Sequence, residues 1–326
     1  MDIFIYNQVI SNATDILKNL IGFNKMKAMI MAAGFGTRLR PLTDKVPKAL
    51  VPVLNRPVLE RNVEYLSNHG IRDIIINAHY HADQIRNFVS SCKIPKVKLT
   101  VSPEEEILGT GGGIARCREF LENDTFVVIN SDILTNIDLD KAVSSHMDSE
   151  DPVTLVLHDY SRFNQIDITR ERKVRKIHNN TAPGRLAFTG IHVLEPEIFN
   201  YLPDEGYADV ISACYNPLIE SGGSINAFIV SGHYWCDIGT IESYTKASMD
   251  FLEFENMQFF KGDNTQMDSS VVMKNWAVIG NNVTIEKDAV IDSSIIWNNV
   301  IIKEGMQVKN SIVIRGTEHI KIFPDN

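Results

Sequence analysis

Short apolar runs alternate with amphipathic stretches through roughly the first two thirds of the chain. The apolar runs, such as AMIMAAG and DIIINAH, are typical of buried strands, whereas PVLERNVEYLSNHG places apolar residues at helical spacing. The expected strands are 28–34, 73–79, 97–102 and 125–132, and the expected helices are 57–70, 81–89 and 111–121. This alternation predicts an α/β protein with a parallel sheet covered by helices on both faces.

The pattern changes after about residue 268. Branched or small apolar residues recur every six positions, at Ile279, Ile285 and Ile291 and again at Val283, Ala289 and Ile295. A six-residue period with intervening asparagine, aspartate and glycine predicts a short left-handed parallel β-helix with three repeats to a coil. A β-sandwich is the alternative. The period slips near 297–299, so we expect two or three coils in 268–326, preceded by a linker at 253–267.

The N-terminal 25 residues lack the basic start and cleavage site of a signal peptide. One face of a possible amphipathic helix would carry Val9, Ala13, Ile16, Leu17 and Leu20. The segment is either a packed helix or an upstream extension, and both interpretations stay open. The main α/β domain is expected at 26–252.

Composition narrows the function classes. The chain has 326 residues and a net charge of −9, which argues against bulk binding of nucleic acid. No apolar stretch approaches the roughly 20 residues of a membrane helix, so no membrane insertion is expected. The four cysteines form no CxxC pair and are expected as free thiols of a cytoplasmic protein.

The string MAAGFGTRLRPLTDKVPKAL follows the first apolar run directly. It lacks the GK[ST] ending of a Walker P-loop, and Leu39 stands where a dinucleotide fingerprint has its third glycine. What remains is a glycine turn at a strand end, backed by Arg38 and Arg40, with backbone N–H groups that could face an anion. Ligands of such sheets bind beyond the carboxyl ends of the strands, which is where this string lies.

Two further features lie at expected strand ends. Gly109 and 111–113 surround Thr110 at the entrance to a helix, and such a loop lets backbone approach a ring or a phosphate closely. Asp132 and Asp237 each end an apolar run. Two such carboxylates can share one Mg²⁺, which prefers oxygen ligands and often bridges carboxylates to substrate phosphates.

These motifs together resemble the sugar-1-phosphate nucleotidyltransferases. The resemblance rests on MAAGFGTRLRPLTDKVPKALVPV, EEEILGTGGG, VVINSD, LAFTGIHVLEPEIF and YWCDIGT and covers about 26–252. It implies a Rossmann-like nucleotide-diphospho-sugar transferase (GT-A-like) fold, and a hexapeptide tail is common in the family. The chain is most similar to the mannose-1-phosphate guanylyltransferases and the (N-acetyl)muramate-1-phosphate uridylyltransferases.

The resemblance implies the reaction NTP + sugar 1-phosphate → NDP-sugar + diphosphate, with Mg²⁺. It gives Arg38 the β- and γ-phosphates and Lys48 the α-phosphate and the sugar phosphate, and it makes Asp132 and Asp237 the Mg²⁺ ligands. Asp132 counts with Arg38 and Lys48 as catalytic. The implied nucleotide contacts are Ala33, Gly34, Gly36, Thr37, Gly109, Thr110, Gly111 and Gly112, and the implied sugar contacts are Thr189 and Gly190.

The chain departs from the family pattern in the sugar-binding region, where VRKIHNNTAPGRLAFTG contains no Glu-Lys-Pro triplet. Lys176 or Arg185 could replace the missing lysine. Ser102 stands where uridylyl- and thymidylyltransferases often have glutamine, and carboxylates at 104–106 would suit the N–H donors of guanine. The expected substrates are therefore GTP and mannose or heptose 1-phosphate, with UTP and (N-acetyl)muramate or hexose 1-phosphate as the alternative.

The same residues argue against two other classes of function. A catalytically silent NDP-sugar-binding regulator should have lost one of Arg38, Lys48, Asp132 or Asp237, and all four are present. An acyltransferase usually needs a histidine in the β-helix, and 268–314 contains none. The exposed coil edges and Trp297 predict a homo-oligomer. Cell-envelope polysaccharide is the expected destination of the product.

Overall fold

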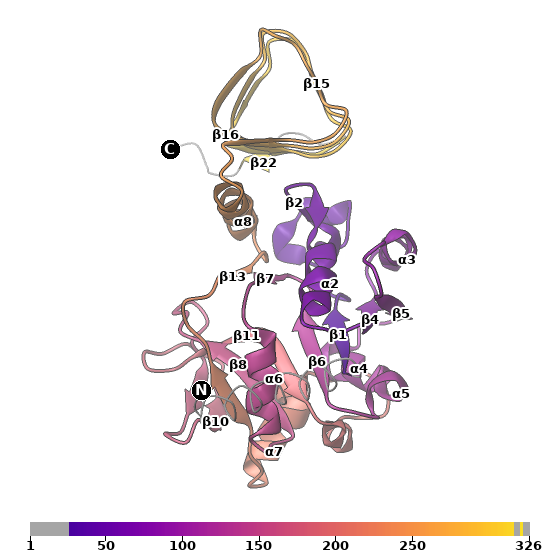
Figure 1. Ribbon diagram of the computed structural model, residues 1–326, viewed down its shortest axis with the longest axis vertical. Coiled ribbons are helices and arrows are strands. Elements are labelled where there is room, and N and C mark those ends of the chain that lie inside the picture. The colour runs from indigo at the N-terminus through magenta and orange to yellow at the C-terminus, as the bar shows by residue number, and fades with distance from the viewer. Residues whose placement is uncertain (1–25, 316–319, 322–326) are drawn as a thin grey trace, which may run out of the picture. The chain divides into compact units, whose positions relative to one another are not determined.

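The computed structural model describes residues 26–315 and the backbone of 320–321 (Figure 1). The helix expected within residues 1–25 lies outside these described residues. Among the helices that the model describes, none has both the length and the apolar character to cross a membrane.

The described residues form two compact units. Of the described residues, the first unit contains 26–35 together with Asn62–Trp235, and the second contains Gly36–Arg61 and those from Cys236 onward. We call Gly36–Arg61 the basic segment. The division falls inside the glycine turn, and it differs from the expected boundary at 253–267 because the basic segment packs with the C-terminal part of the chain.

A seven-stranded sheet forms the centre of the first unit. Its strands, from one edge to the other, are β12 (Asn226–Ile229), β8 (Val153–His158), β11 (Ala187–Leu194), β6 (Phe126–Asn130), β1 (Lys27–Met31), β4 (Asp73–Ala78) and β5 (Lys98–Pro103). β1 pairs in parallel with β4 and β6, and β4 in parallel with β5. The four strands expected from the apolar runs are therefore confirmed as parallel neighbours.

The expectation of a purely parallel sheet is wrong at one strand. β11 runs antiparallel to both β6 and β8. Between β8 and β11 the chain forms only a short antiparallel pair, β9 (Ile166–Ile168) and β10 (Val174–Ile177), and no crossover helix. A parallel connection needs such a crossover, so β11 returns in the opposite direction and begins where β6 ends.

Helices accompany this sheet, and the first four of them lie where the apolar spacing predicts helices, at 57–70, 81–89 and 111–121. They are α2 (Val58–Asn68), α3 (Ala82–Ser91), α4 (Gly109–Arg116), α5 (Arg118–Leu121), α6 (Leu139–Met147) and α7 (Asn216–Glu220), with a π-turn at Ile211–Tyr215 and a 3₁₀ turn at Pro196–Asn200. The helix expected at 111–121 is divided at Cys117, whose φ and ψ are −93° and 11°. The core between helices and sheet includes Met29, Phe126 and Tyr215, all fully buried.

The second unit joins the basic segment to the C-terminal strands. The basic segment contains three 3₁₀ turns (Thr37–Leu39, Leu42–Asp44 and Lys48–Leu50) and the hairpin β2 (Pro52–Val53)–β3 (Arg56–Pro57). After β13 (Trp235–Asp237) the chain enters α8 (Ile241–Phe254), which begins with a capping box between Thr240 and Ser243.

Parallel strands fill the rest of this unit in successive layers, drawn from orange to yellow in Figure 1. They are β14 (Phe259–Lys261), β15 (Gln266–Met267), β16 (Val272–Ile279), β17 (Thr284–Ile285), β18 (Val290–Ile296), β19 (Ile301–Ile302), β20 (Gln307–Lys309) and β21 (Ser311–Val313), and β22 (Ile320–Lys321) pairs antiparallel with β21. We call β14–β21 the strand stack. All six residues of the predicted six-residue period are buried in it.

Two boundaries of the stack differ from expectation. Phe259 pairs with Ala277 and Gln266 with Thr284, so 259–267 belongs to the stack and not to a linker. The slip expected near 297–299 lies earlier, because Lys274 pairs with Asp292 but Ala277 pairs with Ser294. The separation between paired residues of β16 and β18 therefore falls from 18 to 17 at this point.

Candidate active site

In the first unit, the carboxyl ends of β1 and β6 lie side by side. Met31 is in register with Asn130, and the Ser131 amide donates to the Met31 carbonyl at 3.1 Å. Ala33 and Gly34 follow β1, and Asp132 follows β6. Ala33, Gly34 and Asp132 therefore lie at the carboxyl edge of the sheet, as expected for these residues, because strands in a parallel pair end on the same side.

The two glycines of the turn have different surroundings. Gly36 has a φ of +63°, and a Cβ there would lie 2.8 Å from Cγ2 of Thr43, whose hydroxyl donates to the Gly36 carbonyl at 2.9 Å. Gly34 has an ordinary φ, and a Cβ there would meet nothing within 4 Å. The backbone conformation and the contact with Thr43 therefore require a glycine at position 36. No contact among the described residues requires one at position 34.

This difference gives a prediction. Gly34→Ala should leave the melting temperature unchanged and raise KM for the nucleotide by about tenfold or more, because only a ligand would approach that backbone closely. Gly36→Ala should lower the melting temperature, because it adds both backbone strain and a clash. Calorimetry and initial rates measure the two effects. Unchanged kinetics in Gly34→Ala would remove position 34 from the nucleotide site.

In the second unit, Arg38, Lys48 and Asp237 come together. Nη2 of Arg38 lies 3.9 Å and Nζ of Lys48 lies 3.8 Å from the Asp237 carboxylate. Lys48 is 14% exposed and Arg38 is 59% exposed, so the lysine is held by its surroundings and the arginine extends into solvent. A Cβ on Gly239 would lie 2.6 Å from Oδ1 of Asp237 and 2.8 Å from Nη2 of Arg38. The close approach of both groups explains the glycine of the DIG sequence.

Asp132, in the first unit, and Asp237, in the second, each have the donor chemistry that a hard cation prefers. Both offer carboxylate oxygens, which Mg²⁺ prefers to nitrogen or sulfur. Asp237 is partly open, at 19% exposure, and two cationic side chains lie near it. The chemistry of each carboxylate therefore fits a magnesium ion that acts with phosphate groups.

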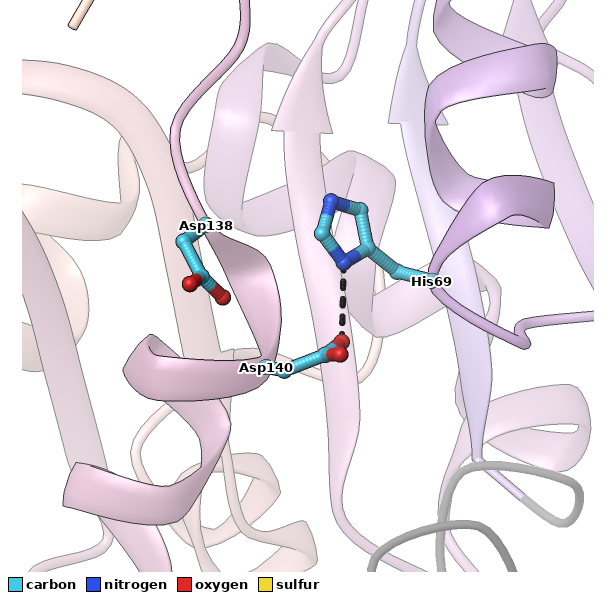
Figure 2. A group of neighbouring side chains, drawn as sticks. All are labelled: His69, Asp138 and Asp140. Carbon is cyan, nitrogen blue, oxygen red and sulfur yellow. Dashed lines mark hydrogen bonds and ion pairs between the residues drawn. The ribbon is translucent and has the colours of Figure 1, made fainter. Parts of the chain in front are cut away.

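A different group of potential metal ligands lies in the first unit. Ligand atoms of His69, Asp138 and Asp140 lie within 4.8 Å of one another (Figure 2). His69 Nδ1 is 2.8 Å from the Asp140 carboxylate, whereas Asp138 accepts from the Lys141 amide at 3.2 Å and pairs with its Nζ at 3.0 Å. These contacts cap α6 and connect it to the end of α2. They explain why the three side chains lie close together, and no metal ion is needed for it.

The second glycine loop packs against the chain's own backbone. The Ala208 carbonyl accepts from the Gly111 and Gly112 amides at 2.8 and 3.1 Å, and a Cβ on Gly109 would lie 2.6 Å from the same oxygen. The Thr110 hydroxyl accepts from the Val210 amide at 2.8 Å. The glycines and Thr110 thus hold the 206–210 segment, a structural role that spacing alone did not reveal.

Glu104 is committed to contacts within the protein. It is buried, and its carboxylate accepts from Nδ2 of Asn77 at 2.7 Å and from the Leu108 amide at 3.1 Å. Asn77 in turn accepts from the Ala32 amide at 2.7 Å. The idea that Glu104 reads a guanine is therefore not supported by its contacts. The buried asparagine at the end of β4 was the signal for this network.

The predicted sugar contacts lie at the start of β11, beside the end of β6. Thr189 is fully buried and its hydroxyl donates to the Val156 carbonyl at 2.8 Å, so its side chain faces the core. Gly190 has a φ of +83°, and a Cβ there would lie 2.8 Å from Nδ2 of Asn130. Of the two proposed replacements for the missing lysine, Arg185 lies 3.7 Å from the Asp167 carboxylate and Lys176 is exposed on β10.

An aromatic cluster that the sequence did not predict lies next to Thr189. Nε1 of Trp235 donates to the Thr189 carbonyl at 2.8 Å, and the Trp235 ring packs edge-on against His158 at 4.7 Å between centroids. His158 also stacks on Tyr160 and lies 3.2 Å, nitrogen to nitrogen, from His233. Burial and the neighbouring imidazole lower the pKa of His158 to about 4.

A pH dependence of stability follows from the buried histidines. Burial also lowers the pKa of His192 to about 3. Both folded-state values lie below the ordinary 6.5, so the unfolded chain binds more protons and stability is lost as the pH falls from 6.5 towards 4. At pH 5 each histidine should cost about 2 kcal/mol. Urea unfolding at pH 7 and pH 5 measures the loss, and His158→Phe should remove roughly half of it. An equal loss in that variant would contradict the assignment.

Comparison with known proteins decides the family. The nucleotidyl transferase family model matches residues 27–253, which include both glycine motifs and both aspartates. The chain belongs to the nucleotidyl transferase family. It is therefore an enzyme of the nucleotidyltransferase class, related to NDP-sugar pyrophosphorylases.

Named relatives of this nucleotidyltransferase differ in their substrates. A UTP–glucose-1-phosphate uridylyltransferase of Synechocystis is 29% identical over 88% of this chain and 82% of its own length. A mannose-1-phosphate guanylyltransferase of Mycobacterium tuberculosis is 26% identical over 89% of this chain and 83% of its own.

Solved structures support the fold of the catalytic part. HddC from Yersinia pseudotuberculosis, solved in complex with GMP-PN, has a TM-score of 0.60 and 29% identity and covers 69% of this chain and 99% of its own. A putative glucose-1-phosphate thymidylyltransferase from Bacillus anthracis has a TM-score of 0.61 and 26% identity, with 69% and 94% covered. The Rossmann-like α/β core is thus shared with both.

Proposed function

We propose that this nucleotidyltransferase joins a nucleoside triphosphate to a sugar 1-phosphate and releases diphosphate. The observation that carries the proposal is the grouping of Arg38 and Lys48 around Asp237, because phosphoryl-type transfer needs cationic clamps and positioning more than a protein nucleophile. The named relatives act on a hexose 1-phosphate, which supports a sugar 1-phosphate as acceptor.

In this mechanism an oxygen of the sugar phosphate attacks the α-phosphorus in line. The bond between the α-phosphorus and the bridging oxygen to the β-phosphorus breaks, and diphosphate leaves with its electron pair. Arg38 binds the β- and γ-phosphates and stabilises the departing diphosphate. Lys48, which is less exposed, binds the α-phosphate and the incoming sugar phosphate and lowers the repulsion between the two anions.

We assign Asp132 and Asp237 to a magnesium ion and Ala33, Gly34, Gly36 and Thr37 to the nucleotide. The ion would neutralise phosphate charge and help to orient the triphosphate. Gly109–Gly112 would face the base on the side of the loop away from the 206–208 backbone. Backbone groups at Thr189 and Gly190 would face the sugar.

For the substrates we favour GTP with mannose or heptose 1-phosphate. The support is the LGTGG sequence, the guanylyltransferase of M. tuberculosis and the guanine nucleotide analogue bound to HddC. Glu104 no longer contributes, because its carboxylate is used within the protein. UTP with a hexose or (N-acetyl)muramate 1-phosphate is the second candidate, favoured by the Synechocystis relative.

We further propose that the strand stack is a left-handed β-helix of the hexapeptide type and that the protein is a cytoplasmic homo-oligomer. Registers of 18 and 17 residues between layers fit three repeats per coil. Trp297 no longer supports an oligomer, because Nε1 of Trp297 donates to the Tyr244 hydroxyl of its own chain at 3.0 Å. The edge of the stack at β14 pairs with no further strand among the described residues, and it remains the reason for this expectation.

The first test is diphosphate release with Mg²⁺, with each of five nucleoside triphosphates against mannose, glucose, heptose and N-acetylmuramate 1-phosphates. Turnover with GTP and a manno-configured sugar is the expected result. Turnover with UTP alone would move the protein to the uridylyltransferases. Absence of turnover by the folded protein across the grid, together with tight binding of an NDP-sugar, would favour the regulator instead.

A further inference from the structure

The hairpin that follows Lys48 is fastened to the strand stack. Its turn residues Leu54 and Asn55 both have left-handed backbone, with φ of +46° and +60°. Nδ2 of Asn55 donates to the Ile279 carbonyl at 3.2 Å and to Oδ1 of Asn281 at 3.3 Å. One amide group therefore joins the tip of the hairpin to the loop that leaves β16.

A second connection runs through α8. The Tyr244 hydroxyl donates to the Pro52 carbonyl at 2.8 Å, and it accepts from Nε1 of Trp297 at 3.0 Å. Tyr244 is fully buried, and burial raises its pKa to well above the physiological range, so the phenol stays protonated and keeps donating. The start of the hairpin is thus connected to the strand stack by two consecutive hydrogen bonds, from Trp297 to Tyr244 and from Tyr244 to Pro52.

These two anchors restrict the backbone next to Lys48. The Val51 amide donates to the Lys48 carbonyl at 3.2 Å, and the Val58 amide donates to the Val51 carbonyl at 3.1 Å. Val51 and Val53 are fully buried, so the chain between Lys48 and the hairpin has little freedom. Asp237 is the last residue of β13, and α8, the helix that carries Tyr244, begins shortly after it at Ile241. Lys48 and Asp237 are therefore tied to one common element.

We propose that Asn55 and Trp297, the latter through Tyr244, are positioning residues for the phosphate site, so that the strand stack holds Lys48 in its working geometry. The inference rests on the proposed function for the nature of the ligand. A displacement of about 1 Å at a clamp can cost up to about 100-fold in rate, so loosening of the hairpin would reach the chemistry. No contact with substrate is assigned to either residue.

Asn55→Gly tests the first anchor, because glycine keeps the left-handed turn and removes only the side chain. Asn264→Gly is the matched control: Asn264 has a φ of +54°, is exposed and donates to Asn282 at 3.2 Å, within the strand stack itself. Trp297→Phe removes the second anchor's N–H and keeps an aromatic ring. We expect Asn55→Gly to lower kcat/KM for the triphosphate and to weaken the binding of inorganic phosphate, the probe for the single phosphate that Lys48 binds, each by about tenfold, and the control to stay near the wild type.

Hydrogen exchange of the Leu50 and Val51 amides provides a readout that does not depend on turnover. Faster exchange there in Asn55→Gly and Trp297→Phe, with weaker binding of inorganic phosphate and an unchanged melting temperature, is the expected result. Unchanged exchange at these amides would overturn the inference, as would faster exchange with unchanged phosphate binding. If the wild type turns over no substrate, the proposed function fails, but the exchange and phosphate-binding measurements still decide the role of Asn55.

Discussion

Asp237→Asn should lower kcat by about 10²–10³-fold at saturating magnesium. The substitution keeps the size of the side chain but removes its charge, so the proposed magnesium ion would lose an anionic ligand. It also leaves Arg38 and Lys48, now within 3.9 and 3.8 Å of the carboxylate, without their shared counter-charge. Asp132→Asn should have an effect of similar size. Diphosphate release over a range of magnesium concentrations measures both variants, and each should also need more metal for half-maximal rate.

Asp44→Asn is the control for this experiment. Asp44 lies in the same basic segment, but its carboxylate pairs with Nε of Arg40 at 3.3 Å on the surface, with 47% and 57% of the two side chains exposed. Exposed pairs of this kind contribute about 0–1 kcal/mol, so the rate should stay near that of the wild type. Near-normal turnover in Asp237→Asn, with a normal response to magnesium, would remove this residue from the metal site.

Lys48→Gln should lower kcat/KM by about 10²-fold or more, because a neutral amide cannot offset the charge that gathers between the two phosphates. The lysine is only 14% exposed, so no bulk cation replaces it easily. The variant should also have a higher KM for the sugar 1-phosphate. Initial rates at varied concentrations of both substrates, with melting temperature as a check on folding, measure the change.

Two further variants serve as controls for Lys48→Gln. Lys48→Arg keeps the charge but needs more room for its planar fork, so it should restore only part of the rate. Arg40→Gln changes another cation of the basic segment, one that is 57% exposed, and should have little effect. A loss of activity as large in Arg40→Gln as in Lys48→Gln would show that the segment acts through its overall charge and not through one placed side chain.

The parallel core and its main motifs could be predicted because both are local properties of the chain. Apolar runs of strand length and apolar residues at helical spacing report burial directly, and β1, β4, β5 and β6 formed where these patterns lie. The six-residue period likewise identified residues that are buried in the strand stack, such as Ile279 and Ala289. The string from Met31 to Leu50 was sufficient to predict phosphate chemistry.

Pairing between distant segments could not be predicted in the same way. The pattern of buried residues does not indicate the direction of a strand. The antiparallel direction of β11 and the contact between Gly190 and Asn130 are therefore seen only in the tertiary structure. The same holds for Glu104, whose charge suggested a ligand while its burial beside Asn77 gave it a structural role. The role of a carboxylate in a loop can be assigned only when the residues that contact it are known.

The sequence by itself determined the class of the core, the glycine turn with its cations and the period of the C-terminal strands. The tertiary structure decided which of these features serve each other: Lys48 and Arg38 beside Asp237, and Asn55 on Asn281. Local patterns are set by torsional preference and burial of neighbouring residues. Contacts between remote residues depend on the closure of long stretches of chain and on many weak interactions at once, and no single stretch of sequence encodes them.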